Sequence, residues 1–281
     1  MSYKTLEVSI ENKIAHVILN RPNELNTMTA EFWQELPQVI TEIDEQASAR
    51  VIVLSSTGKH FTAGMDLSVF TNPNNIPISG DPARSAENLR RLVLQLQNAF
   101  NVLETVRIPV LAAIQGGCIG GGVDMVSAAD CRYCTEDAYF CIKETDLAMT
   151  ADVGTMQRLP HLIPQGMMRE LAYTADRLSA QRAKEIGLVN EIFKDQAALL
   201  EAVNDIALRI AKHSPLAIAG CKEMINYTRD HSVEDSLKYM ATWQSGMFRQ
   251  EDMMKAFAAK AQKMDAEFEE LFPITPPFQN K

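Results

Sequence analysis

The sequence predicts an α/β fold in which β-β-α units repeat, followed by a helical C-terminal region. Two short, continuous apolar runs at 51–54 and 110–114 are typical of strands that are covered on both faces. A strand, an amphipathic helix, a buried strand and a glycine-containing turn follow one another twice, which indicates stacked repeats. From about residue 195 the apolar spacing is almost wholly helical, so we predict a core over 1–195 and a helical region over 196–281.

The first repeat begins with a predicted strand hairpin. Apolar residues alternate with polar ones over 6–10, and an apolar run follows over 14–19 after a short polar turn. Apolar residues then recur at helical spacing over 32–43, with Thr29 as the expected N-cap. Pro37 lies inside this stretch, which either argues against the helix or predicts a kink.

The second repeat has the same order of elements. Residues 71–83 contain three prolines and no periodicity, which predicts a loop and a candidate lid. A long amphipathic helix is expected over 89–103, and the buried strand 110–114 follows it. Glycines within 116–122 then lead into a further helix, which we expect to begin near Asp124.

The helical region is rich in methionine. Methionine at helical spacing is more often a core residue than an oligomer contact, and we expect the core role for this set. Its members are Met240, Met247, Met253, Met254 and Met264.

Length, composition and charge exclude several classes of protein. The chain has 281 residues, 46% of them hydrophobic, and a chain of this length buries roughly three quarters of its unfolded surface, which provides a large core without disulfides. The net charge is −9 without an offsetting basic cluster, so neither nucleic acid nor an anionic membrane is an expected partner. The N-terminus lacks a signal-peptide pattern and no apolar run is long enough to span a membrane, which predicts a cytoplasmic protein.

Motifs of several enzyme classes are absent from the sequence. Gly-x-Gly-x-x-Gly does not fit the glycines at 116–122, and no phosphate loop, Gly-x-Ser-x-Gly or His-Glu-x-x-His motif occurs. Cys131 and Cys134 have the spacing of half a metal site, but no second pair completes it. We therefore expect no metal site and no redox cofactor.

Two glycine-containing turns, each placed after a buried strand, are candidates for a functional site. The first covers 60–67 and the second covers 120–124. Glycine lets a substrate approach the backbone closely, and N–H groups at a helix N-terminus have no partner within the helix. Two such N–H groups that converge on one oxygen form an oxyanion hole. The alternative is that both are merely tight turns, and the pattern favours neither.

Three acids in apolar surroundings are the candidates for proton transfer: Asp124, Glu144 and Asp152. A carboxyl group in an apolar pocket has a raised pKa, and neighbouring carboxylates raise the pKa of one another further. Such groups hold or release a proton near neutral pH, as general acid-base catalysis requires. The alternative is that Asp124 and Asp152 are helix N-caps, a common position for Asp.

Three stretches of the sequence carry a family resemblance. They are Phe-Thr-Ala-Gly-Met-Asp at 61–66, Gly-Gly-Cys-Ile-Gly-Gly-Gly-Val-Asp at 116–124 and Thr-Met-Gln-Arg-Leu-Pro at 155–160. Together they resemble the crotonase superfamily of enoyl-CoA hydratases and isomerases, from Tyr3 to about Lys263. The resemblance implies a crotonase (ClpP-like) spiral of β-β-α repeats over 1–195, a helical oligomerisation region over 196–281 that forms trimers or dimers of trimers, and an acyl-CoA substrate.

The resemblance also implies roles for single residues. The N–H groups of Met65 and Gly121 would hold the thioester oxygen. The three acids, spaced by 20 and 8 residues, resemble the Δ3,5-Δ2,4-dienoyl-CoA isomerase subgroup rather than the hydratases, which have a glutamate at position 124 and typically a glycine at position 152. In that subgroup Glu144 would take a proton from C2, Asp152 would supply a proton to C6, and Asp124 would tune the pair.

Residues that bind the CoA part are implied in the same way. The first glycine turn would contact the substrate through Ala63, Gly64, Asp66 and Leu67, with Lys59 beside it. The stretch Phe257-Ala-Ala-Lys260 resembles the C-terminal helix that closes the adenine pocket of a neighbouring subunit. CoA is part of the substrate, so no separate cofactor is expected.

Two alternatives to the isomerase remain from the sequence. A hydratase of trans-2-enoyl-CoA would hold a water molecule between Asp124 and Glu144 and would leave Asp152 without a role. A non-catalytic oligomeric scaffold or an RNA binder could use the same fold, although the acidic charge opposes RNA binding and the three spaced acids oppose an inert scaffold.

Overall fold

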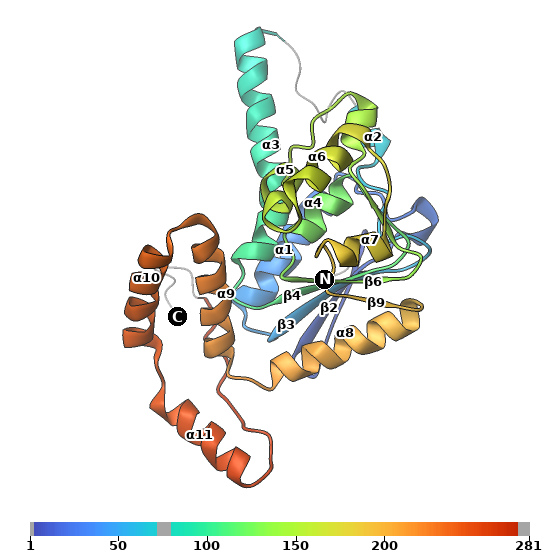
Figure 1. Ribbon diagram of the computed structural model, residues 1–281. Coiled ribbons are helices and arrows are strands. Elements are labelled where there is room, and N and C mark those ends of the chain that lie inside the picture. Colours follow the sequence, from blue (N-terminus) through green and yellow to red (C-terminus); the bar gives the residue numbers. More distant parts are fainter. Residues whose placement is uncertain (1–2, 72–79, 275–281) are drawn as a thin grey trace.

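A mixed sheet forms the centre of the protein in the computed structural model, which describes residues 3–71 and 80–274 (Figure 1). Its described strands run in the order β1-β2-β3-β4-β6-β9, and β1 is antiparallel to β2 while the other neighbours are parallel. The strands are β1 Leu6–Glu11, β2 Ile14–Leu19, β3 Val51–Ser56, β4 Val110–Ile114, β6 Cys131–Thr135 and β9 Glu191–Phe193.

The apolar runs in the sequence correspond to the central strands of this sheet. All residues of β3 and β4 are buried, because helices cover both faces of the sheet. The predicted hairpin is confirmed, with Leu6 opposite Leu19 and Val8 opposite Val17.

Two helices that pack together cover one face of the sheet: α1 (Phe32–Glu45) and α3 (Pro82–Thr105). Their contact includes the rings of Trp33 and Phe100, whose centroids are 5.0 Å apart. The helix predicted over 32–43 is confirmed and continues through Pro37, but the expected N-cap is wrong, because α1 begins after Glu31 and not after Thr29. The predicted loop and candidate lid lie mainly in 72–79, outside the described residues, between α2 (Leu67–Thr71) and α3.

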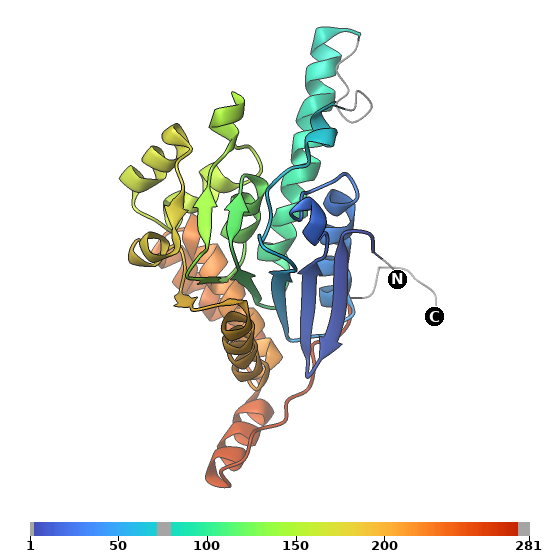
Figure 2. The same cartoon turned by 90° about the vertical axis from the view of Figure 1, so that its right-hand side faces the viewer.

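A smaller sheet lies next to the glycine-rich segment. It consists of β5 (Gly117–Ile119), β7 (Tyr139–Cys141) and β8 (Leu178–Ser179). Short helices pack around it and connect it to the main sheet (Figure 2). They are α4 Gly121–Ser127, α5 Thr155–Arg158, α6 Gln165–Thr174 and α7 Ala180–Glu185, with 3-10 turns at Pro22–Glu24, Glu144–Leu147 and Leu159–His161.

The helical region begins with α8 (Gln196–Ala211), which packs on the second face of the main sheet. Its buried residues Leu199, Val203 and Ala207 contact a cluster that includes Val53 and Leu111. The predicted boundary near residue 195 therefore falls where α8 begins, although α8 itself is part of the core. The division into a catalytic core and an oligomerisation region stays a prediction.

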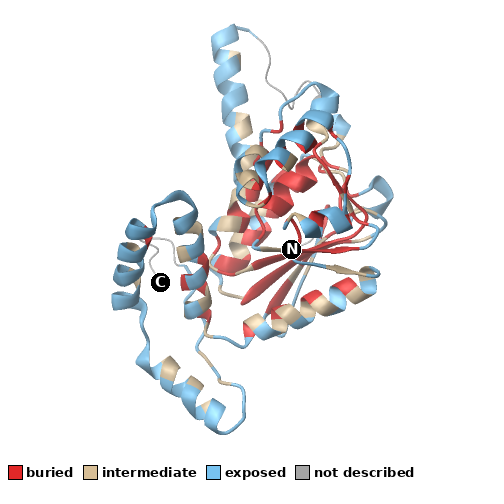
Figure 3. Ribbon diagram, viewed as in Figure 1, coloured by how far each residue is buried: buried red, intermediate tan, exposed pale blue. Residues whose placement is uncertain are grey.

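The last three helices, α9 (Pro215–Asp230), α10 (Val233–Met247) and α11 (Gln250–Ala261), extend away from the sheet (Figures 1 and 3). The expectation that the methionines of this region form a core is wrong for Met240, Met247, Met254 and Met264, which are 38% to 66% exposed. Helical spacing shows that a face is apolar but not what covers it. Among the described helices, none is both long and apolar enough to cross a membrane.

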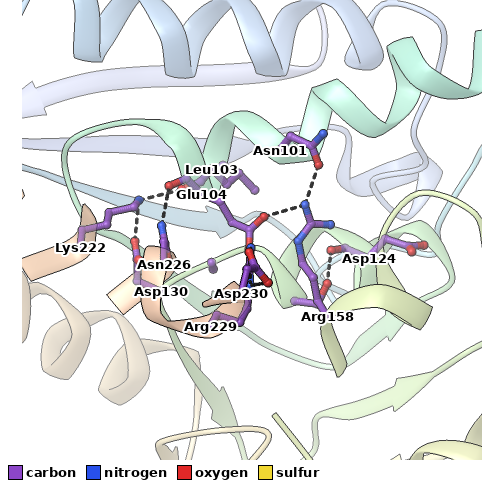
Figure 4. A network of polar contacts seen from close by, with 12 residues as sticks. Asn101, Leu103, Glu104, Asp124, Asp130, Arg158, Lys222, Asn226, Arg229 and Asp230 are labelled. Carbon is purple, nitrogen blue, oxygen red and sulfur yellow. Dashed lines mark hydrogen bonds and ion pairs between the residues drawn. The ribbon is translucent and has the colours of Figure 1, made fainter. Parts of the chain in front are cut away.

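A buried lysine attaches α9 to the body of the protein (Figure 4). The Nζ of Lys222 donates hydrogen bonds to the carbonyl oxygens of Leu103 and Ile108 at 2.8 and 3.0 Å. It also forms an ion pair of 2.8 Å with Asp130, which accepts the N–H of Val110 as well. The Lys222 side chain is only 5% exposed, so these three acceptors satisfy its whole charged group.

Lys222→Met is expected to lower the free energy of unfolding by about 2 to 3 kcal/mol, because two carbonyl oxygens and Asp130 lose their charged donor. Urea unfolding measures this change. The matched control is Lys238→Met on α10, whose ion pair with Glu234 is exposed and whose loss should cost less than about 0.5 kcal/mol. Equal losses in the two variants would contradict the structural role of Lys222.

Candidate active site

The two glycine turns lie against each other. The N–H of Thr62 donates to the carbonyl oxygen of Gly117, and the N–H of Ile119 donates to the carbonyl oxygen of Thr62, both at 3.1 Å. Gly64 has a φ of +90°, and a Cβ at this position would lie 2.8 Å from the carbonyl oxygen of Ile119. Glycine is therefore required at position 64 for the close contact between the turns.

The backbone N–H groups of Met65 and Gly121 take no part in the hydrogen bonds that join the two turns. Met28 and Met65 are opposite each other in a parallel β-bridge. The N–H of Met28 donates to the carbonyl oxygen of Gly64, and the carbonyl oxygen of Met28 accepts the N–H of Asp66. In this pattern the N–H of Met65 itself points away from Met28. Gly121 is the first residue of α4, so its N–H has no partner within the helix. The sulfur of Met28 lies 3.0 Å from where a Cβ of Gly121 would be, and Met28 thus contacts both turns.

Asp124 is fully buried on α4. Its Oδ1 accepts the N–H of Thr155, the first residue of α5, at 2.6 Å. Its Oδ2 is buried and has no hydrogen-bond partner among the described residues. Burial raises the pKa of Asp124 to about 6, although the hydrogen bond from Thr155 acts in the opposite direction.

Glu144 approaches the second glycine turn from the segment that follows β7. Its Oε1 lies 3.1 Å from where a Cβ of Gly120 would be, so a glycine at position 120 makes room for the carboxyl group. Its Oε2 is buried without a partner in the part of the chain that the structure describes. Burial and then the charge of Asp124 raise the pKa of Glu144 to about 7.

Asp152 lies in the segment just before α5. The residue as a whole is exposed in the single chain, but its carboxyl group is desolvated enough by nearby protein to have a raised pKa. The charge of Asp152 in turn raises the pKa values of both Asp124 and Glu144. The three acids predicted from the sequence therefore share one electrostatic environment.

The alternative that these two aspartates are helix N-caps is wrong. Asp124 is the fourth residue of α4, which begins at Gly121 and not near Asp124 as expected. The N-cap of α5 is Gly154, and Asp152 precedes it. Asp124 therefore does not cap α4, and Asp152 does not cap α5.

The first glycine turn also contains most of the residues expected to bind CoA. The N–H of Ala63 donates to the carbonyl oxygen of Leu25 at 3.0 Å, which anchors the turn. The carboxylate of Asp66 accepts the hydroxyl of Thr27 at 2.7 Å and the N–H of Ser68 at 3.0 Å. Asp66 is therefore engaged in structural contacts, while Leu67 at 67% exposure and Lys59 face solvent.

Phe257 and Lys260 do not join the site of their own chain. Both are exposed on α11, and this helix lies at the far end of the helical region from α4 and α5 (Figure 1).

Three side chains near the acids, Gln97, Thr155 and Arg158, have no role assigned from the sequence. The Nε2 of Gln97 donates to the backbone carbonyl of Asp152 at 2.7 Å, and Thr155 binds Asp124 as described above. Arg158 of α5 forms an ion pair with Glu104 at 2.8 Å. Two signals in the sequence could have pointed to them. Thr155 and Arg158 lie in the stretch 155–160 that carries the family resemblance, and the spacing of Gln97 and Glu104 places both on one face of a helix. Within the described ranges, no three His, Cys, Asp or Glu side chains form a group that could hold a metal ion.

Comparison with known proteins identifies the family of this chain. The sequence pattern of the family described as enoyl-CoA hydratase/isomerase matches residues 9–271. The peroxisomal Δ(3,5)-Δ(2,4)-dienoyl-CoA isomerase of Arabidopsis thaliana is 43% identical over 96% of this chain and 99% of that protein. The mitochondrial enzyme of the same name from Mus musculus is 44% identical over 94% of this chain and 81% of that protein.

Solved structures show the same fold. The crystal structure of an enoyl-CoA hydratase from Bacillus anthracis matches this structure with a TM-score of 0.83 and 30% sequence identity, over 97% of this chain and all of that chain. The predicted crotonase fold is confirmed by this match.

The names of the relatives contradict one expectation. They place these proteins in peroxisomes and mitochondria, so the cytoplasmic location expected from the sequence is wrong. Targeting signals are short addresses that receptors read, and they have no necessary connection with the folded core. The family match over residues 9–271, the identity to full-length relatives and the common fold together show that the chain belongs to the enoyl-CoA hydratase/isomerase family.

Proposed function

We propose that this protein converts 3,5-dienoyl-CoA thioesters into 2,4-dienoyl-CoA thioesters in the β-oxidation of unsaturated fatty acids. The observation that carries the proposal is the placement of Asp124 and Glu144, each with a buried carboxyl oxygen, beside the second glycine turn, with Asp152 close enough for its charge to raise the pKa values of both. Relatives that are 43% and 44% identical to this chain bear the name of this isomerase, which supports the same conclusion.

The reaction needs two acids because protons leave and arrive four carbons apart. Glu144 takes a proton from C2, and the electrons of the C2–H bond enter a dienolate that extends from the thioester oxygen to C6. Asp152 then donates its proton to C6, which leaves double bonds at C2 and C4. Glu144 begins ionised and ends protonated, Asp152 does the reverse, and exchange with solvent restores both.

The backbone supplies the third element of the proposed mechanism. Negative charge develops on the thioester oxygen in the dienolate, and the N–H groups of Met65 and Gly121 would stabilise it there. Loss of one such donor typically costs about 3 to 4 kcal/mol of barrier. Because carboxyl groups and backbone donors suffice for these steps, the proposed chemistry uses no metal or redox cofactor.

Hydration of a 2-enoyl-CoA is the second candidate. The unpaired Oδ2 of Asp124 and Oε2 of Glu144 are suited to hold a water molecule, which favours this reaction. It gives Asp152 no role, however, and Asp124 is one methylene shorter than the glutamate expected in hydratases. We therefore rank the isomerase first.

Asp152→Asn is expected to lower the isomerase kcat about 100- to 10,000-fold, because the acid for C6 is lost. The rate of conjugated-diene formation from a 3,5-dienoyl-CoA measures it, with hydration of a 2-enoyl-CoA followed separately. Asp176→Asn, an exposed aspartate on another segment, is the matched control and should keep the wild-type rate. An Asp152→Asn protein with an unchanged isomerase rate, or a wild-type protein that only hydrates 2-enoyl-CoA, would overturn the proposal.

The pH profile of the isomerase is expected to depend on Glu144. The reaction needs Glu144 ionised and Asp152 protonated, so kcat/KM should follow a bell-shaped profile, with a fall at low pH where Glu144 takes up a proton and a fall at high pH where Asp152 loses its proton. The negative charge of Asp124 contributes to the raised pKa of Glu144, so Asp124→Asn should move this acid limb to lower pH. Rate profiles of both proteins between pH 5 and 9 test this, and an acid limb that moves upward in Asp124→Asn would contradict it.

We further propose that the chain functions as a homo-oligomer, a trimer or a dimer of trimers, in which α11 of one copy contributes Phe257 and Lys260 to the CoA site of another. The apolar side chains exposed on α9 and α10 support this arrangement, since Ile225, Val233 and Leu237 are 65% to 72% exposed in the single chain.

Light scattering is expected to give about three or six times the chain mass of 31.3 kDa. Leu237→Glu should shift this mass toward that of the monomer, because a charge would be buried in an apolar contact. Leu200→Glu on α8, where the leucine is 38% exposed, is the matched control and should leave the mass unchanged. A monomeric wild-type protein would refute the proposed assembly.

A further inference from the structure

One face of α3 carries three polar side chains that all contact the segment 152–158. Gln97, Asn101 and Glu104 are separated by four and three residues, so they lie on the same side of the helix. Gln97 donates to the backbone carbonyl of Asp152, while Asn101 and Glu104 accept hydrogen bonds from Arg158. We call these three residues the α3 stripe.

The C-terminal part of the segment is held firmly to the α3 stripe (Figure 4). The Nη2 of Arg158 lies 2.6 Å from Oδ1 of Asn101 and 2.8 Å from Oε2 of Glu104. A Cβ at Gly154 would lie 1.9 Å from Nη1 of Arg158, so a glycine is needed there for the guanidinium to pass. The Arg158 side chain is 10% exposed, and such a charge-assisted pair is strong when it is mostly removed from water.

The N-terminal part of the segment depends on Gln97. This residue is half-buried, and its Nε2 lies 2.7 Å from the carbonyl oxygen of Asp152. Asp152 is exposed whereas Asp124 is fully buried, although Ala151 and Val153 on either side of Asp152 are buried in the core. The hydrogen bond from Gln97 holds the peptide carbonyl of the residue from which the Asp152 carboxyl group extends.

We propose that Gln97 is a positioning residue, which holds Asp152 where its carboxyl group reaches C6 of the dienolate. The inference rests on the proposed isomerase function, in which Glu144 and Asp152 act at opposite ends of the conjugated system. A misplacement of about 1 Å in a reacting group can cost about 100-fold in rate. Loss of the Gln97 hydrogen bond should therefore slow the protonation at C6 and leave the abstraction at C2 intact.

Two rates separate these steps. In D2O, exchange of the C2 protons of a 3,5-dienoyl-CoA requires only Glu144, whereas formation of the 2,4-diene also requires Asp152. Gln97→Met keeps the length of the side chain but removes the donor. It is expected to lower diene formation about 10-fold or more, with C2 exchange, followed by mass spectrometry of recovered substrate, at the wild-type rate.

Gln95→Met is the matched control. Gln95 is the same residue type on the same helix, two positions away and exposed, so its replacement should change neither rate. Melting temperatures of both variants establish that they are folded. A purely structural role for Gln97 would lower C2 exchange and diene formation by the same factor, which would overturn the inference.

A double-mutant cycle with Asp152→Asn completes the test. If Gln97 acts through Asp152, Gln97→Met should cause no further loss of diene formation in the Asp152→Asn protein. A loss that is equally large in both backgrounds would refute the positioning role. If Asp152→Asn alone left diene formation unchanged, the proposed function would fail as well. If Asp152→Asn abolished it while Gln97→Met equalled wild type, the role of Gln97 alone would fail.

Discussion

The hydrogen bond between the N–H of Thr155 and Oδ1 of Asp124 joins the two halves of the site. It connects α4, which follows the glycine turn, to α5, which begins three residues after Asp152. Through Arg158, α5 is attached to α3, and α3 is attached to α9 by Lys222. A displacement of any of these helices would therefore move the carboxyl groups relative to one another.

The carboxyl groups of Asp124 and Glu144 lie in surroundings that are energetically unfavourable for a charged group. A buried acceptor without a partner is uncommon in native proteins, and Asp124 and Glu144 each have one among the described residues. Glycine at position 120 leaves room for the Glu144 carboxyl group beside the turn. Unpaired oxygens and raised pKa values in one place are typical of groups that exchange protons with a ligand.

The single chain leaves a different kind of surface incomplete. The main sheet is covered by α1 and α3 on one face and α8 on the other, but α9 to α11 expose apolar side chains that are not covered by the chain itself. The same helices carry Phe257 and Lys260, which lie away from the acids of their own chain. Assembly and completion of the substrate site are thus linked in the function that we propose.

The sequence by itself determined the strands near 6–10, 14–19, 51–54 and 110–114, the helix over 32–43, the two glycine turns and the choice of the three acids as candidates. These features depend on local patterns, since alternation, continuous apolar runs and glycine constrain the backbone near them. Only the tertiary structure decided that Asp124 lies inside α4, that Gln97 contacts a residue 55 positions away and that the methionines of the last helices are exposed. Such facts depend on which distant segments pack together, and a local pattern contains no information about its partner.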